Sequence, residues 1–257
     1  MVERPTLILL HGGPGADHTF FKPEFAAMAD TAQVIYLDQR GSGRSDHADA
    51  RTWTWTQWAD DVAGFARVLG LGQVILVGSS SGGMVGLVCA ARHPDLVAGL
   101  VLDSPLGTGS TLEESLDVFE RRGGRQAREA AQRYLGGDLS PAAAQAWQAY
   151  GLPLYGSGAG GDLTLRRARA RINDAVQQHF RAGGCGPADA SGFAPAITAP
   201  TLILAGADDP VAPAVGARRL AGTLGGRLEI LAGVGHGVFR QAPEPAFASL
   251  KSFVDNL

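Results

Sequence analysis

The segment Val74–Gly86 constrains the fold of this chain more than any other part of the sequence. Val74–Val77 is a short apolar run typical of a buried strand, and Met84–Ala91 has the small and apolar residues of a helix. Between them lies Gly78-Ser79-Ser80-Ser81-Gly82, a Gly-x-Ser-x-Gly elbow pattern. The middle residue of such an elbow is strained, and the flanking glycines remove side chains that would collide. The sequence therefore predicts that Ser80 presents its hydroxyl above the edge of a sheet.

Apolar runs alternate with helical patterns along much of the chain, as in a parallel sheet covered by helices. Further strands are predicted at Thr6–Leu10, Val34–Leu37, Leu100–Leu102, Thr201–Ala205 and Leu228–Leu231. Helices are predicted at Thr56–Leu69, Val215–Leu224 and Ala246–Val254. We therefore expect an α/β fold with a mostly parallel sheet flanked by helices.

This alternation stops between residues 107 and 195, where no apolar strand occurs. Helices are predicted there at Glu113–Tyr134, Pro141–Tyr150 and Arg166–Phe180, and the run Gly156–Gly161 looks like a flexible hinge. We interpret residues 107–195 as a helical cap inserted into a core made of residues 1–106 and 196–257. The mixed charges of the cap indicate a solvated outer face.

Charge and cysteine content exclude several classes of function. A net charge of −3 argues against a nucleic-acid or anionic-membrane surface, and no apolar run approaches membrane-spanning length. Cys89 and Cys185 form neither a disulfide framework nor a metal-binding spacing, and no signal peptide is visible. We expect a cytoplasmic protein that acts on a small molecule or short peptide, without a metal or cofactor and without binding nucleic acid or membrane.

Reactive side chains in parallel sheets gather beyond the carboxyl ends of the strands. Of the six histidines, His236 alone lies in a glycine-flanked loop after a late strand, and Asp209 follows the strand Thr201–Ala205. The chain order Ser, Asp, His is that of an α/β-hydrolase triad. In a triad the imidazole takes the serine proton, and the carboxylate orients the imidazole and stabilises its charged form. The sequence therefore predicts a triad of Ser80, Asp209 and His236.

Two other carboxylates compete for the role of the acid. Asp208 is adjacent to Asp209, but the spacing Gly206-x-x-Asp209-x-x-x-Pro213 favours the latter. Asp103 follows the strand ending at Leu102, where a structural role in a turn is the simpler interpretation.

Three motifs together resemble those of the α/β-hydrolase superfamily and, more narrowly, of its prolyl iminopeptidase group. They are His-Gly-Gly-Pro-Gly at 11–15, Asp-Gln-Arg-Gly-Ser-Gly-Arg-Ser at 38–45 and Gly-Ser-Ser-Ser-Gly-Gly at 78–83. The resemblance implies an oxyanion hole formed by the N–H groups of Gly13 and Ser81, with Gly12 as the second choice of donor. It also implies that Asp38–Ser45 is a scaffold loop beside the site.

The cap departs from this group, since prolyl iminopeptidases hold the substrate's amino group with cap glutamates and here the cap glutamates end at Glu129. We expect a serine hydrolase of small amides or esters, with removal of an N-terminal proline as the first candidate activity. A carboxylesterase or lactonase is the alternative, followed by a ligand receptor or a lyase on the same fold. Aromatic residues predicted to form the pocket wall are Trp147, Tyr150, Tyr155, Phe180 and Phe239.

Overall fold

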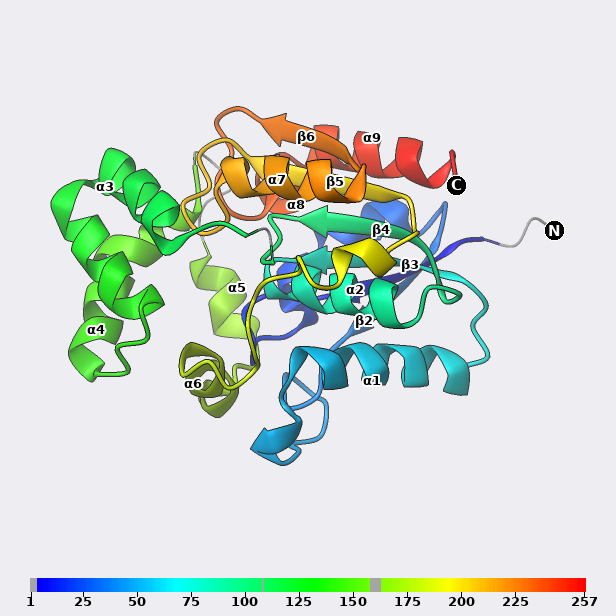
Figure 1. Ribbon diagram of the computed structural model, residues 1–257, viewed down its shortest axis with the longest axis horizontal. Helices are drawn as coiled ribbons and strands as arrows, with labels where there is room; N and C mark the ends of the chain where they lie inside the picture. The colour runs from blue at the N-terminus through cyan, green and yellow to red at the C-terminus, as the bar shows by residue number, and fades with distance from the viewer. Residues whose placement is uncertain (1–3, 108, 158–162) are drawn as a thin grey trace.

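The computed structural model describes residues 4–107, 109–157 and 163–257. Six strands form one sheet in the order β2-β1-β3-β4-β5-β6, and every neighbouring pair is parallel (Figure 1). The strands are β1 (Thr6–Leu10), β2 (Gln33–Leu37), β3 (Val74–Ser79), β4 (Val97–Asp103), β5 (Thr201–Gly206) and β6 (Arg227–Leu231). The predicted α/β fold with a parallel sheet flanked by helices is confirmed.

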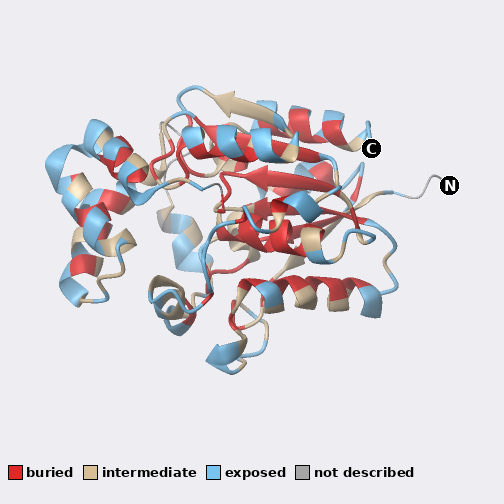
Figure 2. Ribbon diagram, viewed as in Figure 1, coloured by how far each residue is buried: buried red, intermediate tan, exposed pale blue. Residues whose placement is uncertain are grey.

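Both faces of the sheet are covered, so the central strands β1, β3, β4 and β5 are buried on each side (Figure 2). One face packs against helices α1 (Trp55–Val68), α2 (Ser81–Arg92) and α7 (Ala214–Leu224). The other face packs against the short helices η1 (His18–Phe21), η2 (Glu24–Met28) and α8 (Val238–Gln241), and against α9 (Pro243–Val254). Burial on both sides explains why these strands read as continuous apolar runs.

The chain leaves the sheet after β4 and returns at β5, and the described residues between them add no strand to it. This part contains α3 (Leu112–Leu135), α4 (Pro141–Ala146), η4 (Trp147–Gly151), η5 (Leu152–Tyr155), α5 (Thr164–Arg169), α6 (Asp174–Arg181) and η7 (Ala194–Ala196). In Figure 1 the green helices α3 and α4 lie beyond one end of the strands. The boundaries 106/107 and 195/196 stay a prediction, and most of the predicted hinge at 156–161 falls outside the described residues.

The single helix predicted at Arg166–Phe180 is wrong, because α5 and α6 are separate helices. The interruption has a tertiary cause. The N–H of Arg171 donates to Asp17 Oδ2 at 3.0 Å, and the N–H of Asn173 donates to the carbonyl of Gly15 at 2.7 Å. The Asn173 side chain then caps α6 by accepting the N–H of Ala175 at 3.1 Å. These contacts draw the chain between the two helices onto the glycine loop after β1.

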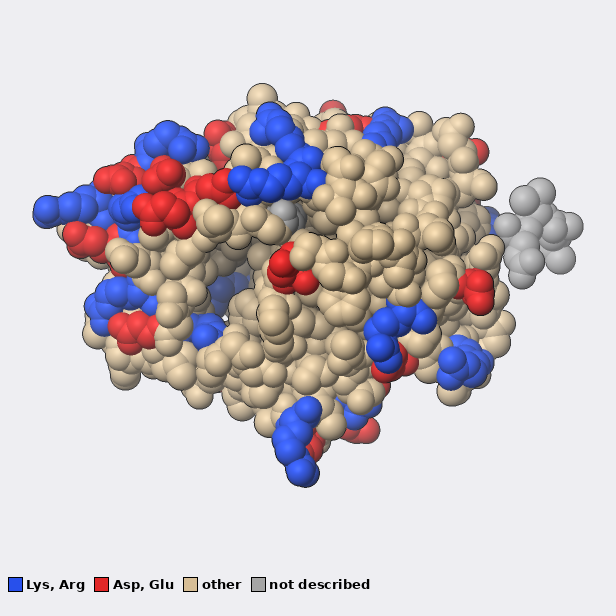
Figure 3. Space-filling model, in the orientation of Figure 1, with Lys and Arg blue, Asp and Glu red and all other residues tan. Residues whose placement is uncertain are grey.

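Charged side chains gather at the end of the molecule formed by α3 and α4, and the surface is hollowed between this end and the sheet (Figure 3). The described residues between β4 and β5 are called the cap below. On α3, Arg128 forms ion pairs with Glu113, Asp117 and Glu120. None of the helices built from the described residues is long and apolar enough to cross a membrane.

Candidate active site

Ser80 lies at the turn between β3 and α2 with φ 53° and ψ −119°, a backbone conformation that is strained for a residue with a side chain. Three backbone hydrogen bonds hold it there. Its N–H donates to the carbonyl of Asp103, and its carbonyl accepts the N–H groups of Gly83 and Leu106, each at 2.9 Å. The side chain is half-buried and lines a cavity of about 760 Å³. This volume lies within the range of small-molecule sites.

The two glycines of the elbow are required by close approach of other backbone atoms. A Cβ atom on Gly78 would lie 2.5 Å from the carbonyl oxygen of Gly82, and one on Gly82 would lie 1.9 Å from that of Leu10. Both distances are shorter than any normal contact of a methyl group. The pattern Gly-x-Ser-x-Gly is thus explained by packing of β1, β3 and α2.

Asp209 and His236 come together from the loops that follow β5 and β6. Asp209 Oδ2 is 2.8 Å from His236 Nδ1, and the carboxylate is completely buried. Its Oδ1 accepts the N–H groups of Val211 at 2.8 Å and Ala212 at 2.9 Å. Because an ionised carboxylate only accepts, Nδ1 of the imidazole carries the proton in this contact. The carboxylate therefore fixes the orientation and the tautomer of the ring.

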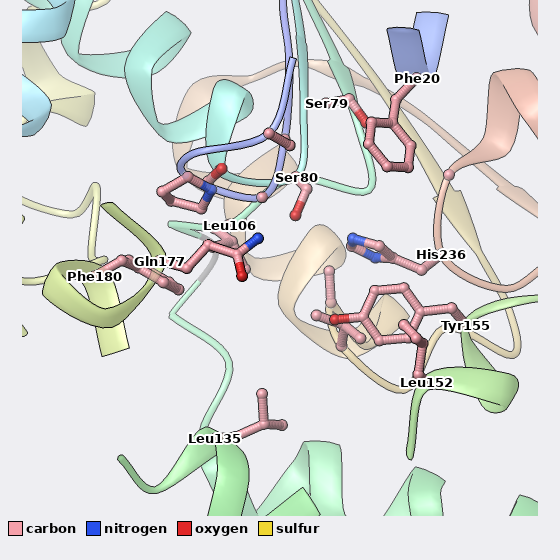
Figure 4. A pocket seen from close by; sticks show the side chains of 18 of the residues that line it. Phe20, Ser79, Ser80, Leu106, Leu135, Leu152, Tyr155, Gln177, Phe180 and His236 are labelled. Atoms are coloured by element: carbon pink, nitrogen blue, oxygen red, sulfur yellow. The ribbon is translucent and has the colours of Figure 1, made fainter. Parts of the chain in front are cut away.

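The imidazole of His236 and the hydroxyl of Ser80 point toward each other across the cavity (Figure 4). The Ser80 hydroxyl makes no hydrogen bond to any of the described residues. Serine–histidine contacts are commonly loose before a substrate binds and tighten in the reacting complex. The three predicted triad residues thus meet at one place, beyond the carboxyl ends of the strands.

The competing acids lie in other environments. Asp103 accepts the N–H of Val238 at 2.6 Å and the hydroxyl of Ser79 at 3.0 Å, so it supports the turn that begins α8. Burial raises the pKa of Asp103. Asp208 holds the loop through its backbone, since its N–H donates to the carbonyl of Val234 at 2.9 Å.

The other five histidines have partners away from Ser80. The pairs are His18 with Asp38, His47 with Asn173, His93 with Asp60, His179 with Trp53, and His11 with Gln39.

The glycine loop after β1 borders the serine directly. A Cβ on Gly12 would lie 2.7 Å from that of Ser80, and Gly13 has φ 56°. Gly12, Gly13 and Ser81 all line the cavity. Ser81 is the first residue of α2, where backbone N–H groups have no partner within the helix. Such groups are suited to binding an oxyanion.

Aromatic and aliphatic side chains form much of the remaining wall. Trp147, Tyr155, Phe180 and Phe239 line the cavity, as do Phe20, Leu106, Leu135 and Leu152 (Figure 4). Tyr150 does not lie on this wall, since its residue is 43% exposed in the π-helical turn η4. Trp147, in the same turn, is 4% exposed and lines the cavity, whereas Tyr150 does not.

Two residues that the sequence does not single out join the cap to the loops of the site. The guanidinium of Arg122, in α3, donates to the carbonyls of Leu154 at 2.5 Å, Asp208 at 2.7 Å and Gly156 at 2.7 Å. It therefore bridges a cap segment and the loop that carries Asp209. Arginine is abundant in this chain, so no local pattern distinguishes Arg122 from the exposed Arg121 beside it.

Gln241, in α8, makes the second bridge. Its Oε1 accepts the N–H groups of Ser157 at 2.7 Å and Gly235 at 3.1 Å, and its Nε2 donates to the carbonyl of His236 at 2.8 Å. The N–H of His236 donates to the carbonyl of Tyr155 at 2.7 Å. The histidine loop is thus bound on one side by the cap.

Among the described residues, no cluster of three or more His, Cys, Asp or Glu side chains could hold a metal ion. Burial raises the pKa of the Cys89 thiol to about 12, so this cysteine stays protonated at neutral pH.

Comparisons with known proteins agree with this architecture. The chain is 33% identical over 118 residues to a proline iminopeptidase of Lactobacillus helveticus, covering 44% of this chain and 40% of that protein. It is 35% identical over 139 residues to a 2-(acetamidomethylene)succinate hydrolase of Mesorhizobium japonicum, covering 52% of this chain and 48% of that protein. The matches thus span less than half the length of these curated relatives.

Solved structures resemble the whole chain. The proline iminopeptidase of Mycobacterium smegmatis matches with a TM-score of 0.79 and 25% identity, covering 98% of this chain and 89% of that one. A thermophilic esterase from Thermogutta terrifontis matches with a TM-score of 0.70 and 24% identity, covering 99% and 90%. The alpha/beta hydrolase fold family matches residues 5–243, and this protein belongs to that family.

Proposed function

We propose that this protein is a serine hydrolase that cleaves small esters or amides through an acyl-enzyme on Ser80. The observation that carries the proposal is the buried 2.8 Å contact between Asp209 and His236, on a ring that faces the strained Ser80. His236 would accept the hydroxyl proton while Ser80 Oγ attacks the substrate carbonyl. It would then give this proton to the leaving oxygen or nitrogen as that bond breaks. A water molecule, activated by the same imidazole, would release the acyl group.

The N–H groups of Gly13 and Ser81 would bind the oxyanion, with Gly12 as the alternative donor. Their support is position, since all three line the cavity beside Ser80. Loss of one such donor typically costs about 2.7–4 kcal/mol of transition-state stabilisation.

Two substrate classes follow from different observations. The curated relatives named proline iminopeptidase favour removal of an N-terminal proline from a short peptide. The predominantly apolar and aromatic cavity wall favours a carboxylic ester or lactone. Proline p-nitroanilide and p-nitrophenyl butanoate, assayed side by side, separate the two.

The catalytic proposal is tested with Ser80→Ala. We expect this variant to lose both turnover and covalent labelling by a fluorophosphonate, because the nucleophilic oxygen is gone. Ser252→Ala, at an exposed position in α9, is the matched control and should label like the wild type. Undiminished labelling of Ser80→Ala would remove Ser80 from the mechanism.

A further inference from the structure

Two polar side chains of the cap reach the space beside Ser80 and His236 and make no hydrogen bond to the described residues. They are Tyr155, at the end of η5, and Gln177, in α6. Figure 4 shows the phenol and the carboxamide directed into the space beside Ser80 and His236, from different sides. A polar group in a largely apolar cavity is unfavourable unless a ligand or water satisfies it. A ligand that displaces water from these two groups must bring polar partners of its own, or the hydrogen bonds to water are lost without replacement.

Tyr155 is held firmly in this position. Its carbonyl accepts the N–H of His236 at 2.7 Å, and its ring contacts the imidazole edge to face at 5.1 Å. On its other side it contacts the ring of Trp147 at 5.8 Å. Burial raises the pKa of Tyr155, so the phenol is protonated at neutral pH and can donate a hydrogen bond.

Gln177 is held on the side of the glycine loop. A Cβ on Gly15 would lie 3.3 Å from Gln177 Cγ, so the stem of the glutamine packs against that loop. The N–H of Asn173, four residues earlier, donates to the carbonyl of Gly15 at 2.7 Å and ties α6 to the same place. The stem of Gln177 is thus held in place, and its carboxamide offers both a donor and an acceptor.

Three carboxylates line the cavity, and none of them is a buried side chain that is free to pair with a cation. Glu24 lines the cavity, but both of its oxygens bind Arg166. Asp103 is buried and accepts two hydrogen bonds from the protein. Asp174 is exposed at the first residue of α6. A substrate ammonium next to the scissile carbonyl would require a free buried anion, and the described wall does not supply one.

We propose that Tyr155 and Gln177 form a subsite for an uncharged amide group on the acyl part of the substrate, so that the protein prefers N-acylated acyl donors. An amide carbonyl accepts from the phenol, and an amide N–H donates to the carboxamide oxygen, so each group of the pair gains a partner. This inference rests on the proposed serine hydrolase activity and adds the substrate class.

The test uses two esters of equal chain length. N-acetylglycine p-nitrophenyl ester carries an amide where p-nitrophenyl pentanoate carries two methylenes. The rate for each ester is divided by the rate at which hydroxide hydrolyses the same ester, which corrects for the different intrinsic reactivity of the two. We expect the wild type to have the higher kcat/KM for the amide ester. Tyr155→Phe and Gln177→Met should each lower this preference about fivefold, the typical effect of one hydrogen bond. Because the preference is a ratio of two esters measured on the same variant, a general effect of either substitution on the site cancels from it.

Tyr150→Phe and Gln145→Met are the matched controls, since both residues belong to the cap but do not line the cavity. Each should keep the wild-type preference. If both subsite variants hydrolyse the two esters and retain the full preference, the subsite is wrong while the hydrolase activity stands. If the wild type hydrolyses neither ester, the proposed function fails and the subsite fails with it.

Discussion

His11 is a buried histidine whose hydrogen bonds require a neutral ring. Its Nε2 accepts the N–H of Gln39 at 3.1 Å, and its Nδ1 lies 3.1 Å from the carbonyl of Gly12, which leaves Nδ1 as the donor. A second bond runs from Gln39 Nε2 to the carbonyl of His11 at 2.8 Å. These contacts anchor the start of the glycine loop beside Ser80. Burial, the largest cause, lowers the pKa of His11 below 6.5.

A lowered pKa makes the folded state lose stability in acid. Below pH 6.5 the unfolded chain binds a proton on His11 that the folded chain does not, so the free energy of unfolding decreases as the pH falls toward the folded-state pKa. The slope for this one group is at most about 1.4 kcal/mol per pH unit. Urea unfolding at pH 7.5, 6.5 and 5.5 should therefore show a smaller loss for His11→Gln than for the wild type. Equal losses in the two proteins would show that His11 does not control this dependence.

At the level of single residues, the sequence identifies candidates where the chemistry requires a recognisable local pattern. Ser80 stands between glycines, and His236 lies in a glycine-flanked loop after a strand, so both could be selected without a structure. Arg122 and Gln177 could not, because their roles come from partners distant in the chain and from the direction of their side chains. Tyr150 and Tyr155 are equivalent in sequence pattern, and only the turn between them separates an exposed ring from one in the cavity.

At the scale of elements, the elbow depends on how closely α2 approaches β1. Gly82 and Gly64 are both helical glycines, but the space around them differs. A Cβ on Gly82 would lie 1.9 Å from the carbonyl oxygen of Leu10, whereas one on Gly64 in α1 would meet nothing within 4 Å. The same substitution should therefore have opposite effects at the two positions.

We expect Gly82→Ala to destabilise the protein by about 3 kcal/mol or more, because β1 and α2 must separate. Gly64→Ala should stabilise it by about 0.5–1 kcal/mol, because alanine loses less backbone entropy in a helix. Thermal and urea unfolding of both variants measure the difference. A Gly82→Ala variant as stable as Gly64→Ala would show that the elbow is not closely packed.

The elements of the sheet were more predictable than those of the cap for a physical reason. Strands such as β1 and β5 are buried on both faces, so their sequences are continuous apolar runs with clear ends. Helices α5 and α6 are interrupted by hydrogen bonds to Asp17 and Gly15, which lie more than 150 residues earlier. No periodicity within the segment itself records such contacts.

At the scale of the whole molecule, the site is assembled from both the core and the cap. Arg122 connects the cap carbonyls of Leu154 and Gly156 to the core carbonyl of Asp208, adjacent to the acid. Tyr155 lies between the first two and accepts the N–H of His236. One guanidinium therefore couples the cap to both loops of the Asp–His pair, although it does not itself line the cavity. We therefore predict that Arg122 acts as a positioning residue for this pair.

Removing the guanidinium should lower kcat in a protein that still folds. In Arg122→Ala the carbonyls it joined would be free to separate, and a displacement of about 1 Å at catalytic groups can cost on the order of 10²-fold in rate. We expect a loss of kcat of this order with a much smaller change in KM for p-nitrophenyl butanoate, and slower fluorophosphonate labelling. Arg122→Lys should recover part of the loss, since an ammonium can reach some of the same carbonyls.

Arg121→Ala is the matched control for this coupling, because Arg121 is the adjacent residue of α3 and is exposed. It should leave kcat and labelling unchanged. Thermal unfolding of all three variants separates positioning from general stability, since a purely structural role lowers the melting temperature without slowing the enzyme that remains folded. A folded Arg122→Ala with the kcat and labelling rate of Arg121→Ala would mean that the core holds Asp209 and His236 in place without the cap. The cap would then serve only to enclose the substrate, and its contacts with the acid and histidine loops would contribute to stability alone.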